Sequence, residues 1–251
     1  MTIQLPEQTR ALLLDIEGTT TSIAFVYDTL FPFARAHMAA FLEAHWDDTA
    51  VQADVALVRE QAAEDVAAGL AGATEIPTHD AEAARALTLA NLIGQMDADR
   101  KTTGLKSLQG KIWLDGYARG ELLAHLFDDV QPALERWHAQ GKALYIYSSG
   151  SIAAQKLLFK HSIAGDLTPL LSGYFDTTTG PKKVEASYTS ICEAVSLDPE
   201  QVCFLTDNLD EAHAAHAAVL TAILSVRPGN PDVPEHPFPT LTSFADLTES
   251  P

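Results

Sequence analysis

The sequence is poor in positive charge. Its 251 residues include 34 Asp and Glu against 16 Lys and Arg, which leaves a formal net charge of −18 at pH 7. Binding to nucleic acid or to an anionic membrane depends mainly on Lys and Arg side chains that neutralise phosphates. We therefore expect no nucleic-acid partner and no membrane partner, and any phosphate-bearing ligand must be held by a local site.

Long apolar runs and cysteines are also scarce. The run "AVLTAILSV" at 218–226 reaches about half of the roughly 20 residues that a membrane-spanning helix needs. The start of the chain, "MTIQLPEQTR", lacks the basic residues and long apolar stretch of a signal peptide. Cys192 and Cys203 are the two cysteines, and their spacing favours buried reduced thiols over a metal site. We expect a cytoplasmic protein.

Four short apolar runs have the character of strands that are buried on both faces. Each is too short for a helix, and helical patterns separate the last three, as is typical of a parallel sheet in an α/β fold. The runs are "ALLLD" at 11–15, "ALYIYSS" at 143–149, "VCFLTD" at 202–207 and "TAILSV" at 221–226.

Three of these runs end on polar residues, namely Asp15, the pair Ser148 and Ser149, and Asp207. In an open parallel sheet, ligands bind in the crevice beyond the carboxyl ends of the strands. We therefore expect these side chains to converge on one site.

The interval between the first and second runs is far longer than one crossover helix requires. It carries apolar residues at three- and four-residue spacing together with good helix formers. The pattern predicts helices at 33–46, 53–71, 80–99 and 116–127, with breakers at 72–77 and 102–104. We predict a helical cap domain at 23–127, inserted into an α/β catalytic core formed by 1–22 and 128–251.

Asp15 and Glu17 lie two residues apart at the end of the first run, ahead of "GTT" at 18–20. A carboxylate can attack phosphorus to form an acyl-phosphate, which divides one difficult displacement into two easier ones. A second carboxylic acid can protonate the leaving oxygen and later accept a proton from water. The loop "GTT" is expected to offer backbone N–H groups and hydroxyls to phosphoryl oxygens.

Two carboxylates and a phosphate repel one another unless positive charge is present. Mg²⁺ supplies that charge, because it prefers oxygens from one or two carboxylates, waters and a substrate phosphate. Asp207 is the expected further ligand, and Glu211 could hold a metal-bound water. Asn208 and Asp210 are less favoured substitutes.

The two remaining polar segments are suited to binding an anion. Ser148 and Ser149 precede a predicted helix, where a hydroxyl and backbone N–H groups can bind phosphate oxygens. One lysine from "TTTGPKKVEASY" can neutralise both the nucleophile and the phosphate. We favour Lys182 over Lys183, because Lys182 directly follows Gly180 and Pro181.

These polar segments, in this order along the chain, resemble the motifs of the haloacid-dehalogenase superfamily of phosphohydrolases. The chain is more similar still to the enolase-phosphatases of methionine salvage, also called acireductone synthases, in which Glu stands at the position of Glu17 where the superfamily usually has Asp. The segments that carry the likeness are "DIEGTTTSIAFVYDTLFPFARAHMAAFLEAHW", "SLQGKIWLDGYARGEL", "YIYSSGSIAAQKLLFKHS", "GYFDTTTGPKKVEASY" and "FLTDNLDEA". The resemblance implies a Rossmann-like parallel-sheet core with an inserted all-helical cap.

The resemblance also implies roles for individual residues. Asp15 would be the nucleophile and a Mg²⁺ ligand, Glu17 the acid/base with its backbone carbonyl on the metal, and Asp207 the remaining protein ligand. Thr206 stands where the commonest superfamily form has Gly, a difference that we interpret as compatible with metal binding.

Further residues would hold the anion and support the metal. The resemblance implies phosphate binding by Ser148, Ser149 and Lys182, and support of the metal shell by Glu211. The implied substrate is a small phosphorylated metabolite, 2,3-diketo-5-methylthiopentyl-1-phosphate, which is enolised and then loses phosphate to give the acireductone. We hypothesise that Glu17 also supplies the base for enolisation.

Other classes of protein would place different requirements on the same residues. A serine hydrolase built on Ser149 would need a G-x-S-x-G elbow, whose first glycine "YSSGS" lacks. A dehalogenase would use Asp15 without needing Glu17 or magnesium. A phosphatase of the same superfamily with another small phosphorylated substrate stays open, since a cap determines specificity. The oligomeric state also stays open, with a monomer as the expected state.

Overall fold

The computed structural model describes residues 2–249, which divide into two compact units. The first unit joins the N-terminal segment through Val26 to the segment from Leu123 onward, and the second is Tyr27–Leu122. The predicted boundaries at 23 and 127 lie a few residues outside the second unit.

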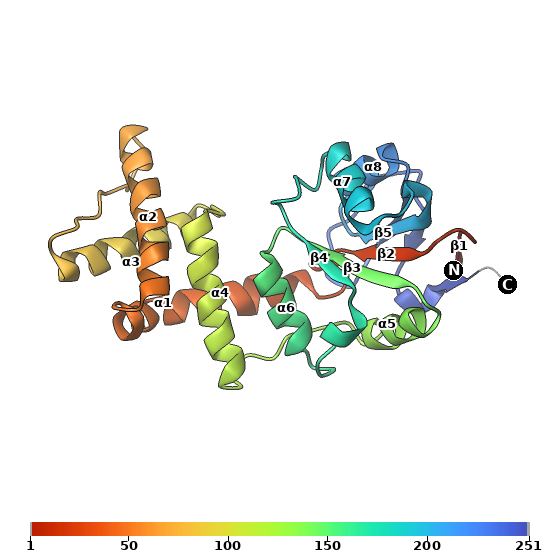
Figure 1. Cartoon of the computed structure of the whole chain (residues 1–251), viewed down its shortest axis with the longest axis horizontal. Coiled ribbons are helices and arrows are strands. Elements are labelled where there is room, and N and C mark those ends of the chain that lie inside the picture. The colour runs from red at the N-terminus through yellow and green to blue at the C-terminus, as the bar shows by residue number, and fades with distance from the viewer. Residues whose placement is uncertain (1, 250–251) are drawn as a thin grey trace. The chain divides into compact units, whose positions relative to one another are not determined.

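The first unit is built on a six-stranded parallel sheet with the order β4-β3-β2-β5-β6-β7 (Figure 1). Its strands are β2 (Ala11–Leu14), β3 (Ala143–Tyr147), β4 (Gly173–Phe175), β5 (Val202–Thr206), β6 (Thr221–Ser225) and β7 (Thr240–Leu241). A separate parallel pair joins β1 (Ile3–Leu5) to β8 (Leu247–Glu249). The four predicted strands are confirmed as β2, β3, β5 and β6. The other strands are two or three residues long, too short for a pattern to reveal.

Helices cover both faces of this sheet, with α7 and α8 on one side and α5 and α6 on the other (Figure 1). These helices are α5 (Val130–Ala139), α6 (Ile152–Lys160), α7 (Glu185–Val195) and α8 (Leu209–Ala217), and short 3₁₀ turns lie at Thr168–Leu170, Pro199–Gln201 and Phe244–Asp246. All four residues of β2 are fully buried. Burial on both faces explains why this strand is an uninterrupted apolar run.

The register of the sheet places the carboxyl ends of its central strands side by side. Leu14 of β2 is paired with Ile146 of β3 on one side and with Leu205 of β5 on the other. The residues that follow these pairs therefore emerge at the same edge of the sheet.

The second unit consists of helices, as the insertion pattern predicts. A π-helical segment, Phe25–Leu30, leads into α1 (Phe31–His45), which is followed by α2 (Thr49–Ala67), α3 (Ala81–Asp97) and α4 (Thr103–Ala118). Helix α4 packs against both α1 and α2. Across residues 2–249, none of the helices combines the length and apolar character needed to cross a membrane.

The predicted helix at 116–127 is wrong. Helix α4 ends at Ala118, and Gly120 has a φ of +71°. The N–H of Glu121 donates to the carbonyl of Gly116 at 2.9 Å, and the N–H of Gly120 donates to the carbonyl of Tyr117 at 3.1 Å. This is a Schellman end, in which a glycine adopts the left-handed conformation just past the helix.

A buried ion pair joins the segment after β6 to the start of α5. Nη1 of Arg227 lies 2.7 Å from Oδ2 of Asp129 and 3.0 Å from the carbonyl of Thr242. Asp129 also accepts hydrogen bonds from the hydroxyl of Ser243 and the N–H of Phe244. Burial alone would raise the pKa of Asp129, but the hydrogen bonds and charge of Arg227 outweigh it, so the pKa lies below its usual value.

Because its folded-state pKa is depressed, Asp129 should stabilise the protein above its unfolded pKa and lose that effect as pH falls through the folded value. We expect Asp129→Asn to lower the Tm at pH 7 and to flatten the fall in Tm below about pH 4. Thermal unfolding across pH 3 to 7 measures both. Asp232→Asn, at an exposed site, is the control. If Tm fell equally steeply with falling pH in the two variants, Asp129 would not be the source of the acid sensitivity.

Gly104 allows a close approach between α4 and α2. A Cβ at this position would lie 2.8 Å from Cγ2 of Val58 and 3.1 Å from both the carbonyl oxygen of Asp54 and the backbone nitrogen of Val58. A Cβ at Gly110, on the same helix, would meet no atom within 4 Å.

We expect Gly104→Ala to lower the free energy of unfolding by about 1–3 kcal/mol, because backbone atoms of α2 cannot move aside easily. Gly110→Ala should instead be neutral or stabilising by up to about 1 kcal/mol, since alanine is the better helix former. Chemical denaturation of both variants tests the pair. Similar effects from the two substitutions would show that the contact with α2 is not limiting.

Candidate active site

Asp15 directly follows β2 and is held firmly by its own neighbourhood. Its side chain is buried, its N–H donates to the carbonyl of Leu205 at 2.9 Å, and its Oδ1 accepts the N–H of Ile16 at 2.8 Å. The hydroxyl of Thr20 lies 3.1 Å from the backbone carbonyl of Asp15. The carboxylate therefore has one defined orientation at the carboxyl edge of the sheet.

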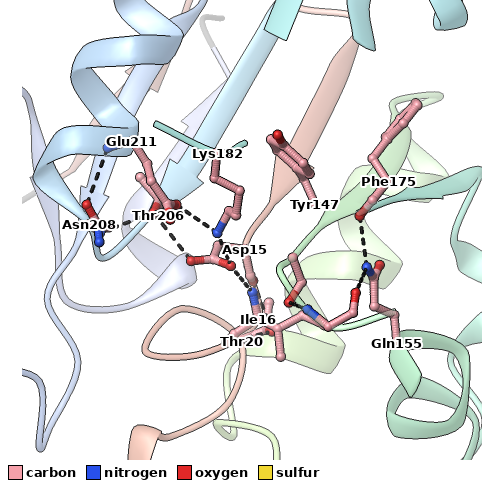
Figure 2. Close-up of polar contacts among 12 residues, drawn as sticks. Asp15, Ile16, Thr20, Tyr147, Gln155, Phe175, Lys182, Thr206, Asn208 and Glu211 are labelled. Atoms are coloured by element: carbon pink, nitrogen blue, oxygen red, sulfur yellow. Dashed lines mark hydrogen bonds and ion pairs between the residues drawn. The ribbon is translucent and has the colours of Figure 1, made fainter. Parts of the chain in front are cut away.

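Lys182 lies between two carboxylates, those of Asp15 and Glu211 (Figure 2). Its Nζ is 2.6 Å from Oδ1 of Asp15 and 2.7 Å from Oε2 of Glu211. Burial by itself would lower the pKa of Lys182, but the two carboxylates outweigh it and hold the pKa above its usual value. The ammonium is thus charged at neutral pH.

The two adjacent lysines point to different surroundings. The backbone carbonyl of Lys182 accepts the hydroxyl of Tyr188 at 2.6 Å, which fixes the chain just before α7. Lys183 is exposed and pairs with Asp210 at 2.8 Å. Of the two lysines, Lys182 is the one that contacts Asp15, as the sequence analysis favoured, although its role in binding phosphate stays a prediction.

Thr206 closes a ring of polar contacts around this lysine. Its Oγ1 lies 2.8 Å from Oε2 of Glu211 and 3.4 Å from Oδ2 of Asp15, and it accepts the N–H of Asn208 at 3.1 Å. Burial and then the charge of Asp15 raise the pKa of Glu211 above its usual value, against the opposing effect of Lys182. Thr206 therefore helps to hold Glu211 beside Asp15.

Asn208 serves as the N-cap of α8. Its Oδ1 accepts the N–H groups of Asp210 at 3.0 Å and Glu211 at 3.4 Å. This cap orients the first turn of α8 so that Glu211 is buried while Asp210 is exposed.

Asp207 lies against the loop that follows Asp15. Gly18 has a φ of +67°, and a Cβ there would lie 2.1 Å from Oδ2 of Asp207. Glycine is therefore required both by the turn and by the close carboxylate. Burial first, and then the charges of Asp15 and Glu211, raise the pKa of Asp207 to about 7.

The acidic groups at this edge fit a divalent cation. Burial contributes most to the raised pKa of Asp207, the charges of Asp15 and Glu211 add to it, and the charge of Lys182 opposes it. Mg²⁺ prefers oxygen ligands, and the expected set needs only the carboxylates of Asp15 and Asp207 together with one backbone carbonyl, that of Glu17. Residues 2–249 hold no ready cluster of three His, Cys, Asp or Glu side chains for a metal.

The loop after β3 is held by a glutamine. Nε2 of Gln155 donates to the carbonyls of Gly150 and Phe175, both at 2.8 Å (Figure 2). Ser148 is buried, and its hydroxyl accepts the N–H of Gly150 at 3.2 Å, whereas Ser149 is exposed. The structure thus places both serines at the edge where Asp15 emerges, and their phosphate contacts stay predictions.

The expectation for "GTT" is wrong for the backbone N–H groups of its threonines. The N–H groups of Thr19, Thr20 and Thr21 all donate to the carbonyl of Ile16, at 3.2, 2.9 and 2.9 Å, and the three side chains are fully buried. The turn at Gly18 winds the loop back on itself, so these donors are consumed within the loop. Glu17 is partly buried in this loop, and its acid/base role stays a prediction.

Two supporting residues were missed by sequence reasoning. From the sequence, Thr206 is only a departure from the usual Gly. Its hydroxyl lies between the carboxylates of Asp15 and Glu211 because β5 pairs with β2, and a local pattern does not show that pairing. Gln155 lies in an ordinary helical pattern, and no local signal marks it. Both act through contacts between separate elements.

Comparison with known proteins gives consistent results. A family model described as haloacid dehalogenase-like hydrolase matches residues 9–218. The chain is 49% identical to the protein named enolase-phosphatase E1 of Synechococcus elongatus, over 97% of this chain and 99% of that protein. It also resembles the solved UTR4 protein of Saccharomyces cerevisiae, with a TM-score of 0.74 and 30% identity over 93% of this chain and 97% of the other.

Some relatives are longer. The chain is 49% identical, over 95% of its length, to a probable bifunctional methylthioribulose-1-phosphate dehydratase/enolase-phosphatase E1 of Populus trichocarpa. It spans 47% of that protein, which is about half its length.

Replacing Thr206 tests the ring of contacts. Thr206→Val keeps the shape but removes the hydroxyl, and a hydrogen bond to a charged group contributes about 1.5–3 kcal/mol. We expect it to lower the rate of phosphate release from a phosphate monoester by about tenfold or more. Thr206→Ser should retain most of that rate. Equal rates for the valine and serine variants would show that the hydroxyl is dispensable.

Proposed function

The chain belongs to the haloacid dehalogenase-like hydrolases and, within them, to the enolase-phosphatase E1 family, and we propose that its substrate is 2,3-diketo-5-methylthiopentyl-1-phosphate. The protein is a phosphatase. The proposed products are the acireductone 1,2-dihydroxy-3-keto-5-methylthiopentene and phosphate, which places the reaction in methionine salvage. The observation that carries the proposal is the Asp15 carboxylate at the end of β2 with the Lys182 ammonium 2.6 Å away.

In the proposed phosphoryl transfer, Asp15 is the nucleophile. One of its carboxylate oxygens attacks phosphorus, the bond from phosphorus to the substrate oxygen breaks, and an aspartyl-phosphate forms. Lys182 neutralises charge on Asp15 and on the incoming phosphate, and its position between two carboxylates keeps it protonated for that role.

Glu17 is proposed to donate and accept protons in both the enolisation and the phosphoryl transfer. As an acid it gives its proton to the departing oxygen of the enediol. As a carboxylate it then takes a proton from a water molecule, whose oxygen attacks phosphorus and releases phosphate and free Asp15. In the earlier enolisation, the same base is proposed to remove the carbon-bound proton. The electron pair of that C–H bond forms the C=C bond, and the former carbonyl oxygen becomes an enolate that takes a proton from water.

Asp15, Asp207 and the backbone carbonyl of Glu17 are proposed to hold Mg²⁺. A bound Mg²⁺ supplies positive charge that offsets the acidic groups and stabilises developing negative charge on phosphate and enediolate oxygens. The oxygen-only donor set supports this choice, because Mg²⁺ prefers carboxylate and carbonyl oxygens.

We further propose that the enzyme is cytoplasmic and works as a monomer. The excess of acidic over basic residues supports a small anionic substrate held by one local site rather than a polyanionic partner. The alternative is a phosphatase of the same superfamily that acts on another small phosphorylated metabolite.

The decisive experiment measures phosphate release and the ultraviolet absorbance of the enediol from the diketo phosphate. Both signals should appear with Mg²⁺ and disappear with a chelator, because the site then lacks the charge that offsets its carboxylates. Asp15→Asn should abolish phosphate release, since an amide cannot form the acyl-phosphate. Release from a panel of sugar phosphates, but not from the diketo phosphate, would overturn the substrate assignment and keep the chemistry of Asp15.

An aspartate at position 17 separates the two proposed roles of Glu17. Glu17→Asp withdraws the carboxylate by one methylene, so both enolisation and phosphate release should slow if one group serves both. An unchanged rate of enediol formation beside slower phosphate release would assign the enolisation base to another residue.

A further inference from the structure

The loop after β6 contacts the loop that carries Glu17. Nδ2 of Asn230 lies 2.9 Å from the carbonyl oxygen of Gly18, and Nε of Arg227 lies 3.0 Å from that of Thr19. The next carbonyl, that of Thr20, accepts the N–H of Phe127 at 3.1 Å. Three consecutive carbonyls of this loop are therefore held by residues outside it.

The amide of Asn230 can be oriented without ambiguity. Its Nδ2 also lies 3.3 Å from the carbonyl oxygen of Ser225, so the group that faces two acceptors must be the NH₂. The N–H of Asn230 donates to the carbonyl of Arg227 at 3.0 Å, and Gly229, with a φ of +87°, supplies the turn between them. The tight turn presents both side chains to the same loop.

Arg227 is itself fixed by the rest of the unit. It is 4% exposed, its guanidinium carbon lies 4.8 Å from the ring centre of Phe127 and 4.4 Å from that of Phe244, and its Nη1 pairs with Asp129. A planar guanidinium that lies close to two aromatic rings and is paired with a carboxylate has little freedom. The contact with Thr19 is therefore made by a rigid donor.

Gly18 is enclosed from two directions. Its carbonyl is held by Asn230, while its Cα faces Oδ2 of Asp207, so closely that a Cβ there would lie 2.1 Å away. The carbonyl proposed to bind Mg²⁺, that of Glu17, belongs to the peptide that joins Glu17 to Gly18. A shift of Gly18 away from Asp207 would move this carbonyl relative to Asp207.

We propose that Asn230 and Arg227 are positioning residues for the reaction. They set the distance between the Glu17–Gly18 peptide and Asp207, and through it the geometry of the Mg²⁺ ligands and of the Glu17 side chain. The inference rests on the proposed function, because it concerns the residues assigned there to the metal and to proton transfer. Neither residue contacts Asp15 or Lys182 in any hydrogen bond described for residues 2–249.

The effect of Asn230 on stability should be modest. Its Oδ1 is buried without a hydrogen-bond partner among the described residues, so truncation removes an unsatisfied acceptor together with the two donated bonds. A change in metal affinity that exceeds the change in stability is therefore the signature of positioning.

The test compares Asn230→Ala with a matched amide elsewhere in the chain. Asn91, in α3 of the second unit, likewise donates from Nδ2 to two carbonyls, those of Thr74 at 2.9 Å and Leu87 at 2.8 Å. Asn91→Ala thus also removes two hydrogen bonds from an amide to backbone carbonyls, but in a helix that does not carry Asp207. Mg²⁺ binding is measured by calorimetry without substrate, and kcat, KM and Tm are measured beside it.

We expect Asn230→Ala to weaken Mg²⁺ binding and lower kcat by about tenfold each, the size typical of residues that orient metal ligands. KM and Tm should stay close to those of Asn91→Ala. Asn230→Asp should be worse than alanine, because a carboxylate oxygen would face the carbonyl of Gly18. Should Asn230 variants fold poorly, Arg227→Lys keeps the charge beside Asp129, loses the Nε donor to Thr19, and should shift Mg²⁺ affinity in the same direction.

Two negative outcomes are distinguishable. In the first outcome, the unsubstituted enzyme binds Mg²⁺ and releases phosphate, but Asn230→Ala and Arg227→Lys have the same Mg²⁺ affinity and kcat as Asn91→Ala. This outcome overturns the positioning role alone. If the unsubstituted enzyme itself neither binds Mg²⁺ nor releases phosphate, the proposed function fails, and the positioning role fails with it.

Discussion

The rest of the first unit depends on the buried pairing of Lys182 with Asp15 and Glu211. A buried charge without a partner costs several kcal/mol, so each of these groups needs the others in place. Their contacts of 2.6 and 2.7 Å join three elements that are distant in the sequence: the end of β2, the turn before α7 and the first turn of α8. One ammonium between two carboxylates leaves net negative charge, and Asp207 adds to it. This imbalance is the physical basis for expecting a cation at the same edge of the sheet.

The loop after Asp15 shows how a short polar segment is made rigid. Its threonine N–H groups fold inward onto the carbonyl of Ile16, and its own outward carbonyls are held by Arg227 and Asn230. Gly18 permits both the turn and the approach of Asp207. A loop in which three backbone N–H groups and two carbonyls are held in this way can keep a reactive carboxylate in one geometry, which reduces the reorganisation needed during a reaction.

The central part of the fold could be predicted from local patterns, and the failures have identifiable causes. The strands β2, β3, β5 and β6 are apolar runs because both faces of the sheet are covered, so composition alone reveals them. The helix expected at 116–127 failed because apolar residues continue at helical spacing beyond Ala118, while the left-handed conformation of Gly120 ends the helix. The threonines after Gly18 were assigned to phosphate because their donors are chemically suitable, but the carbonyl of Ile16 already takes those donors.

The sequence by itself determined which chemical groups are available and in what order: Asp15 and Glu17 after the first strand, a lysine pair after Gly180, and acidic residues after β5. The sequence also favoured Lys182 over Lys183 as the partner of Asp15. Only the tertiary structure decided which acidic residue is buried beside Asp15 and which side chains hold the loop of Glu17. The bonds from Arg227 and Asn230 join residues 208 and 212 positions apart. Such partners are selected by sheet register and by the path of the connecting loops, and a local pattern carries no information about either.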